Sequence, residues 1–109
     1  MANIYKKVNT DLISGTEQSV YTVPSNSRSL AKAIHVYNEG AGDAVVTVKI
    51  TSGGTTYFYE KKTMAADAHH EFITNILILQ ENDVLKMLSD ITGPDVTISL
   101  LEMNREDNG

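Results

Sequence analysis

The sequence predicts an all-β protein, folded as a single antiparallel β-sandwich, Ig-like or jelly-roll-like, of about eight strands. Nine Val, nine Ile and eleven Thr make up 29 of the 109 residues, and β-branched side chains favour pleated strands over helices. Short apolar runs alternate with clusters of Gly, Asn, Asp, Ser and Pro about every ten residues. This rhythm is typical of strands joined by turns, and the length suits one domain with one core.

Each predicted strand is a short apolar or alternating segment bounded by turn-forming residues. Pro24 ends the second strand because proline cannot donate a hydrogen bond to a neighbouring strand. Ile34 and Val36 share one face of their strand and are predicted core residues. Gly53 and Gly54 favour a hairpin turn between two segments. In chain order, the predicted strands are residues 4–8, 20–23, 30–37, 46–50, 57–59, 71–73, 76–79, 84–88 and 96–100.

The segments between the predicted strands contain no predicted stable helix. Three alanines between Met64 and Ala68 favour a helical turn, but the segment is too short for a stable helix. Because no helix is long enough for a parallel crossover, the sheets are predicted to be antiparallel. Five aspartates fall at predicted turns, where a carboxylate caps backbone N–H groups. They are Asp43, Asp67, Asp83, Asp90 and Asp95.

The chain is predicted to divide into three parts. Residues 1–14 form an N-terminal strand or arm, residues 15–103 the β-sandwich domain, and residues 104–109 a polar C-terminal tail with nothing to bury. No apolar stretch follows the lysines near the N-terminus, so no secretory signal is expected. No apolar run approaches the roughly 20 residues that cross a bilayer. We therefore expect synthesis in the cytoplasm and no membrane partner.

Composition argues against several classes of function. Nine Lys and Arg against fourteen Asp and Glu give a formal net charge of −5, so the average surface repels the phosphates of nucleic acid. The chain has no Cys, which excludes disulfides, thiolate metal sites and a thiol nucleophile. Nucleic acid is therefore not an expected partner.

No catalytic, metal-binding or cofactor-binding group of residues is predicted. His69 and His70 are adjacent, so on a regular strand they point to opposite faces and cannot close on one ion. His35 lies in an alternating strand without a triad spacing, although triads assemble from distant positions. The glycines at Gly40 and Gly53 precede no helix that could hold a phosphate. The chain is therefore not expected to be an enzyme.

The first strand and the tyrosines supply the candidate contact residues. Period two puts Tyr57 and Tyr59 on one face of their strand and Phe58 on the other. Core packing could use such a face, and so could a contact with another subunit or a sugar ring. Lysines such as Lys6 and Lys7 are too dispersed along the chain to predict a basic groove. The interface candidates are Ile4, Tyr5, Val8, Tyr37, Tyr57 and Tyr59.

Several strand patterns together resemble small β-sandwich structural proteins of tailed bacteriophage virions. Residues 20–24, Val-Tyr-Thr-Val-Pro, resemble a "tVP" strand, and residues 33–38 a "v..ivvtN" strand. Residues 78–87 resemble a "vL..gD.l.v" element, in which Asn82 replaces the usual Gly and still tolerates a left-handed conformation. Residues 96–102 resemble the closing strand of these proteins.

This resemblance implies a virion structural protein, synthesised in the host cytoplasm, that performs no catalysis. The implied role is a capsid decoration or cement subunit. Such a subunit binds the major capsid protein or another virion protein in many copies and is itself a homo-oligomer. The alternative is a tail, neck or fibre accessory module that recognises a glycan or receptor through its tyrosines.

Overall fold

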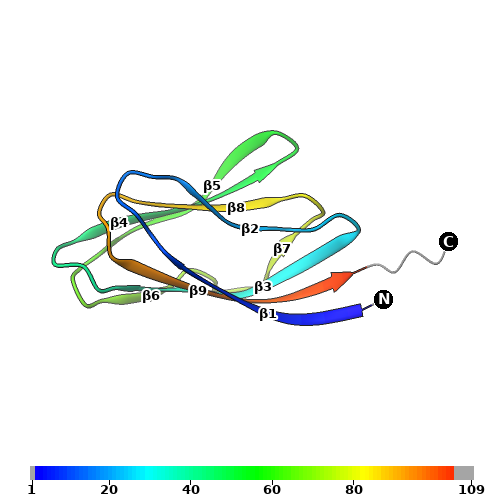
Figure 1. The fold of residues 1–109 in the computed structure, drawn as a ribbon, viewed down its shortest axis with the longest axis horizontal. Helices are drawn as coiled ribbons and strands as arrows, with labels where there is room; N and C mark the ends of the chain where they lie inside the picture. Colours follow the sequence, from blue (N-terminus) through cyan, green and yellow to red (C-terminus); the bar gives the residue numbers. More distant parts are fainter. Residues whose placement is uncertain (1, 105–109) are drawn as a thin grey trace.

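The computed structural model describes residues 2–104, which form a two-layer antiparallel β-sandwich (Figure 1). These residues contain no helix, and hence none suited to crossing a membrane. Residues 105–109 of the predicted polar tail lie outside the described residues. The predicted all-β fold is confirmed, with nine strands. They are β1 (Ala2–Asp11), β2 (Gln18–Thr22), β3 (Ser27–Asn38), β4 (Ala44–Ser52), β5 (Thr55–Met64), β6 (His69–Glu71), β7 (Leu77–Leu79), β8 (Val84–Ser89) and β9 (Pro94–Asn104).

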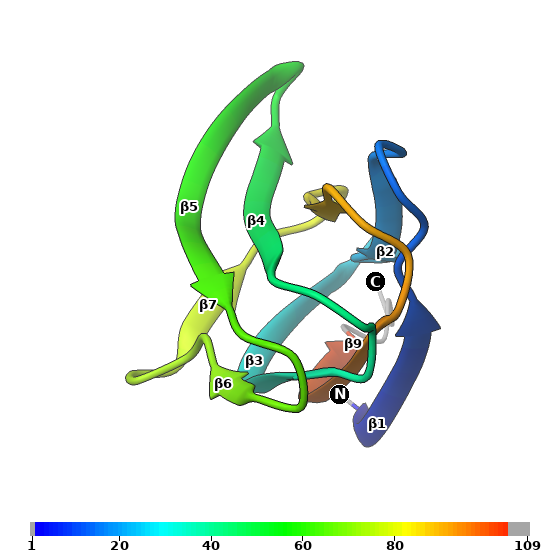
Figure 2. The same ribbon diagram turned by 90° about the vertical axis from the view of Figure 1, so that its left-hand side faces the viewer.

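The strands form two sheets with jelly-roll connectivity (Figure 2). Sheet A has the order β1-β9-β3-β6, with β7 also pairing with β3, and sheet B has the order β2-β8-β4-β5. All these pairings are antiparallel. Because β6 and β7 both lie beside β3, they act as one interrupted strand. Counted so, the order is that of an eight-stranded jelly roll rather than of an immunoglobulin domain.

Glu71 accounts for the interruption between β6 and β7. Its Oε2 accepts hydrogen bonds from the backbone N–H of Ile34 at 2.7 Å and of Ile73 at 3.0 Å. The carboxylate thus satisfies a donor of β3 that a continuous neighbouring strand would have paired. The strand predicted for residues 71–73 is therefore wrong in position, since β6 begins and ends two residues earlier.

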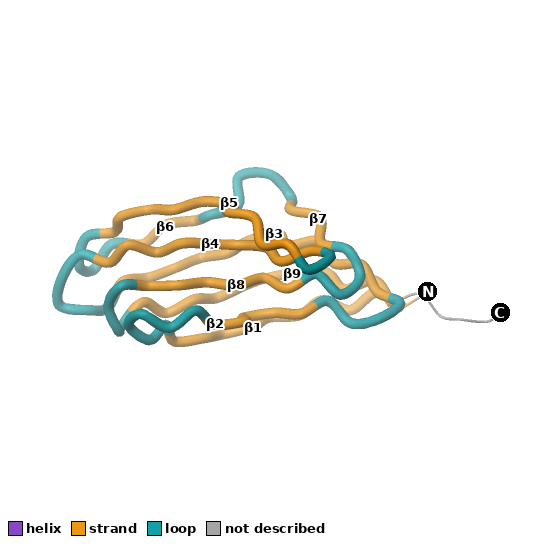
Figure 3. Tube along the Cα trace, turned by 90° about the horizontal axis from the view of Figure 1, so that it is seen from above, coloured by secondary structure: helices purple, strands orange, loops and turns teal. Residues whose placement is uncertain are grey.

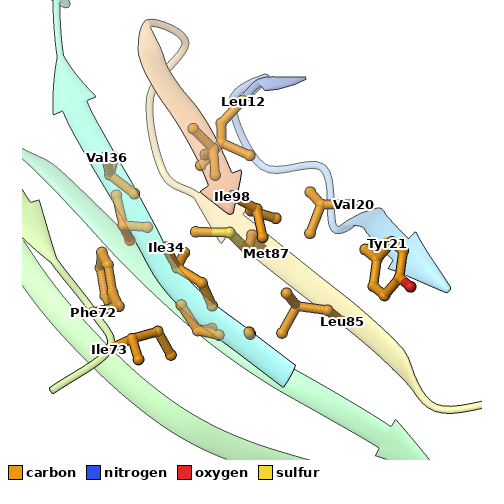
Figure 4. Packing of buried hydrophobic residues seen from close by; sticks show 14 of the residues in the cluster. Leu12, Val20, Tyr21, Ile34, Val36, Phe72, Ile73, Leu85, Met87 and Ile98 are labelled. Atoms are coloured by element: carbon orange, nitrogen blue, oxygen red, sulfur yellow. The ribbon is translucent and has the colours of Figure 1, made fainter. Parts of the chain in front are cut away.

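Side chains of alternating parity fill the space between the sheets. In β9 every second residue from Pro94 to Glu102 is buried. In β3 the alternation is interrupted near Lys32, where the register to β9 shifts at a β-bulge. The predicted core residues Ile34 and Val36 are fully buried. Around them the core cluster includes Leu12, Val20, Tyr21, Phe72, Leu85, Met87 and Ile98 (Figure 4).

Strands run along the length of the sandwich, and loops lie at its two ends (Figure 3). At one end, Leu12 N–H donates to Pro94 O at 2.9 Å and Gly93 N–H donates to Leu12 O at 3.3 Å. Gly93 has a φ of 139°, and a Cβ there would lie 2.9 Å from the Gly40 Cα. Only glycine fits where the β3–β4 and β8–β9 loops touch.

The fully buried Asn38 side chain ties two loops together at the same end. Its Nδ2 donates to the carbonyl oxygens of Gly42 at 2.9 Å, Met64 at 3.1 Å and Ala65 at 3.1 Å. Its Oδ1 accepts from Gly40 N–H at 3.0 Å. The amide therefore links the β3–β4 loop to the chain after β5, and every one of its polar atoms has a partner.

The turn aspartates behave as predicted in two cases and differ in a third. Asp83 and Asp90 accept hydrogen bonds from backbone N–H groups at 2.9 and 2.7 Å. Asp95, in contrast, lies in β9 rather than in a turn, directly opposite Asp11 of β1. The prediction for Asp95 is wrong because β9 already begins at Pro94. Two carboxylates consequently face each other across neighbouring strands.

Candidate interaction surfaces

The β4–β5 hairpin carries three exposed aromatic side chains. Tyr57 is 57% exposed, Phe58 72% and Tyr59 37%. Within residues 2–104, β5 pairs only with β4, so its other edge is free. The turn end of this hairpin projects beyond the rest of the sandwich (Figures 1 and 2). The hairpin thus offers both backbone hydrogen-bonding groups and aromatic surface to another molecule.

A register shift in the hairpin interrupts the predicted alternation of these aromatic residues. Between the Val48 and Lys49 pairs the register moves by one residue, which leaves Tyr59 without a partner on β4. Phe58 lies opposite Lys49, whose Nζ is 4.9 Å from the centroid of the Phe58 ring. Tyr57 lies opposite Ile50, which packs against the core. The three aromatic side chains are therefore not divided simply between two flat faces.

His35 and His69 lie side by side, whereas His70 lies apart from them beside Glu60. Tyr37 pairs with His69, and the buried Val36 pairs with His70, so the adjacent histidines point to opposite faces as predicted. His70 Nε2 is 3.1 Å from Glu60 Oε2 and so links β6 to β5. The His69 ring lies 5.3 Å from that of His35. No group of three or more potential metal-ligating side chains occurs in the part of the chain that the structure describes.

The candidates on β1 divide between the two faces of sheet A. Val8 lies opposite Ile98, packs against the core and is only partly exposed. Ile4 lies opposite the buried Glu102 and is 42% exposed. Tyr5 points outward and is 76% exposed. An outward row of apolar side chains continues from it across the sheet through Leu101, Leu30 and Ile78.

A cationic pocket adjoins Tyr5 on the outward face of sheet A. It has a volume of about 260 Å³ and is lined by Tyr5, Lys6, Lys7, Lys32, Ser99 and Leu100. Lys32 Nζ lies 5.3 Å from the centroid of the Tyr5 ring. The expectation that the lysines make no basic surface is therefore wrong at this place. It failed because strand register brings Lys32 of β3 close to β1, and spacing along the chain does not reveal register.

The opposite end of the same face is acidic. Asp95 lies between Asp11 of β1 and Tyr37 of β3. The neighbouring Asp11 carboxyl raises the pKa of Asp95 to about 6, together with partial burial and the charge of Glu39. The Tyr37 hydroxyl donates to Asp67 Oδ1 at 3.1 Å, which raises the pKa of Tyr37. Tyr37, a predicted contact residue, is 39% exposed beside these acidic groups.

A buried polar network lies inside the basic end of the sandwich. The Tyr21 hydroxyl donates to Glu102 Oε2 at 2.6 Å and lies 2.7 Å from Ser29 Oγ. Lys6 Nζ reaches the same Glu102 oxygen at 3.3 Å. Burial, and then the hydrogen bond to Glu102, raise the pKa of Tyr21 to about 12. Tyr21 is therefore a structural residue that crosses from β2 to sheet A rather than a surface contact.

No family model matches this chain, and no curated protein matches it. Solved structures of similar fold include the following two. One comes from Bacillus endospore appendages, described as disulfide-linked pili, with 17% identity and a TM-score of 0.61 over 95% of this chain and 89% of that chain. The other comes from the acid-stable capsid of Helicobacter pylori bacteriophage KHP30, with 12% identity and a TM-score of 0.59 over 94% of this chain and 88% of that chain.

At these identities the likeness is one of fold. The strand order and the comparisons together place the chain among jelly-roll folds of the kind found in capsid and pilus structural proteins.

Proposed function

We propose that this chain is a structural protein of a bacteriophage virion, and that it acts as a capsid decoration or cement subunit bound to the shell in many copies. The observation that carries the proposal is the likeness to a chain of the KHP30 capsid, which extends over 94% of this chain and 88% of that one. The strand patterns in residues 20–24 and 78–87, which resemble phage sandwich proteins, support the same role. The role requires no catalytic residues.

The proposed mechanism is adhesion through the β4–β5 hairpin. The free edge of β5 accepts a strand of the major capsid protein, because edge strands present unpaired N–H and C=O groups. Tyr57 and Phe58 then lose contact with water, and buried apolar surface contributes about 25 cal/mol per Å². Tyr59, left without a β4 partner, adds a third ring to the contact. Ile4, Tyr5 and Tyr37 supply further contact surface on sheet A.

The chain has no Cys, so its assembly uses no disulfides and differs in this respect from disulfide-linked pili. Each contact can then be individually weak, because many copies on one particle act together.

Mass spectrometry of purified virions tests the role. Particles from a lysate of the source host are expected to contain the chain in many copies per particle. Its absence from purified particles would overturn the proposal.

A binding experiment then tests the hairpin. Purified chain carrying Tyr57→Ala and Phe58→Ala is expected to rebind stripped particles more weakly than the unaltered chain. Asp43→Ala, an exposed change in the β3–β4 loop, serves as the matched control. Equal binding by all three proteins would remove the hairpin from the proposed contact.

The second candidate is a tail, neck or fibre module that recognises a glycan. The exposed rings of Tyr57 and Phe58 favour it, because sugar rings stack on aromatic faces. A glycan array probed with the same hairpin variant separates the two roles. Glycan recognition is supported if the unaltered chain binds a glycan and the double substitution abolishes that binding. If the unaltered chain binds no glycan, the result argues against glycan recognition.

A further inference from the structure

The outward side chains of sheet A form rows that run across β1, β9 and β3. Their neighbours along β3 and β9 are mostly buried, which fixes the rows on the solvent side. Lys32 lies at the bulge beside the first row, and Glu39 follows the third. Next to the row that begins with Tyr5, and running from it towards the acidic end, the rows are Lys7-Ser99-Ala33, Asn9-Thr97-His35 and Asp11-Asp95-Tyr37.

The charges at the two ends of this face are not neutralised by other side chains within residues 2–104. Among residues 2–104, neither Lys7 nor Lys32 forms an ion pair, and neither Asp11 nor Asp95 has a cationic partner. The hydrogen bond with Asp11, then partial burial and the charge of Glu39, raise the pKa of Asp95 at this acidic end of the face. The basic and acidic ends of sheet A are therefore complementary to each other.

The outward face of sheet B provides the contrast. There Lys49 Nζ lies 2.7 Å from Glu17 Oε2, and Lys86 Nζ lies 3.9 Å from Glu17 Oε1. Lys49 and Lys86 thus share a carboxylate of the same chain, whereas Lys7, Lys32, Asp11 and Asp95 of sheet A form no ion pair among the described residues.

We propose that two copies of this chain pack face to face through the outward surface of sheet A, the cationic pocket of each copy receiving the acidic row of the other. The occupant of the pocket is thus a second copy of the chain. This interface stands on the geometry of sheet A alone and does not depend on the proposed virion role.

A two-fold axis that lies in the interface and crosses the strands at the middle row gives this arrangement. It reverses the strand direction, so that each strand lies over the same strand of the other copy. Lys7 and Asp11 are four residues apart, about 14 Å along the strand, and lie on either side of Asn9. Lys7 of each copy then faces Asp11 of the other, and both contacts form at once, as an isologous interface requires.

The pocket provides space for an acidic side chain of the second copy. With a volume of about 260 Å³, it can admit a carboxylate side chain between the lysines, where Ser99 adds a hydroxyl donor. The middle row contains Thr97, whose hydroxyl already donates to Asn9 Oδ1 at 3.0 Å. These side chains are short enough to let the two sheets approach.

The area of the proposed interface indicates how tightly the two copies bind. Three outward rows on three strands cover about 300 Å² per copy, less than half of the ~800 Å² that each partner contributes to a stable interface. The dimer is therefore weak and salt-sensitive, and it forms at high local concentration. Electrostatic complementarity here determines orientation more than affinity.

Two charge reversals, measured alone and mixed, test the arrangement. Lys7→Glu alone places a glutamate carboxylate against Asp11 of the second copy, and Asp11→Lys alone places two lysines together, so each variant repels itself. An equimolar mixture restores both opposite-charge contacts. Sedimentation equilibrium of the full chain at about 0.01 M ionic strength, where the Debye length is about 30 Å, measures the association.

The expected result is that each variant alone associates at least about tenfold more weakly than the unaltered chain, and that the mixture returns to within about threefold. Raising the ionic strength to about 1 M also weakens the association of the unaltered chain at least about tenfold. Lys61→Glu and Asp43→Lys, at exposed positions away from this face, are the matched controls: each changes the net charge by the same amount as its counterpart, so the association of each face variant is compared with that of its control.

Four results would each overturn the interface. They are a monomeric unaltered chain at low salt, undiminished association of either variant alone, no recovery in the mixture, and growth beyond a dimer. Circular dichroism verifies that the variants fold. If Asp11→Lys does not fold, Asp11→Asn takes its place. Alone it removes the attraction to Lys7, and mixed with Lys7→Glu it keeps one opposite-charge contact and removes both repulsions, so recovery then means that the mixture associates more tightly than either variant alone.

Discussion

Removing the Tyr21 hydroxyl is expected to destabilise the sandwich by about 2 kcal/mol. The substitution Tyr21→Phe keeps the ring and its packing, so it tests the hydrogen bonds alone. In the native chain this hydroxyl donates to the 3% exposed Glu102 at 2.6 Å. Hydrogen bonds to charged groups contribute roughly 1.5–3 kcal/mol, and the loss leaves a buried carboxylate with fewer donors.

Urea denaturation measures this loss, and a double-mutant cycle assigns it. Glu102→Gln alone is also destabilising, because Lys6 loses its charged partner. The double variant is expected to lose about 1 kcal/mol less free energy of unfolding than the two single variants lose together, because the two side chains share one interaction. A loss under about 0.5 kcal/mol for Tyr21→Phe, with additive effects in the cycle, would refute the reasoning.

Three further predictions concern the opposite end of the sandwich. Asn38→Ala is expected to cost about 3 kcal/mol in urea denaturation, since it removes four hydrogen bonds of a fully buried side chain, one of them to the carbonyl of the buried Met64. A loss under about 1 kcal/mol would count against that network. Gly93→Ala is expected to lower the melting temperature by at least about 5 °C, because its Cβ would lie 2.9 Å from the Gly40 backbone. An unchanged melting temperature would contradict the close packing of the β3–β4 and β8–β9 loops. The pKa of Asp95 is raised from 3.8 to about 6 in the folded chain, so the folded chain binds this proton more tightly than the unfolded chain, and stability rises as the pH falls from 7 towards 4. After allowance for solvent screening, the free energy of unfolding rises by about 1 kcal/mol over this pH range. Asp95→Asn should abolish this rise and stabilise the chain at pH 7. A pH dependence that survives the substitution would show that another group is responsible.

Much of the fold could be predicted because its signals are local. The alternation in residues 96–100 and the shared face of Ile34 and Val36 follow from the period of a strand, and both hold in the structure. Turn residues likewise located most of the loops. The choice between an immunoglobulin-like and a jelly-roll order was left open, because strand pairing depends on contacts that local patterns do not encode.

The surfaces were harder to predict because they depend on register. The pocket at Lys7 and Lys32 exists only because β1, β9 and β3 align as they do. The facing of Asp11 and Asp95 has the same origin, and a pattern centred on turns assigned Asp95 to the wrong role. Glu102 was not predicted as a buried residue, although it continues the alternation of Val96, Ile98 and Leu100, because a carboxylate ordinarily faces solvent.

The proposed role as a capsid-bound subunit is tested most directly by a cryo-electron microscopy map of the virion. The account predicts density for the jelly roll at symmetry-related positions on the outer surface of the shell, with the β4–β5 hairpin directed at the shell protein. A shell without such density, or density confined to the tail or fibres, would contradict it.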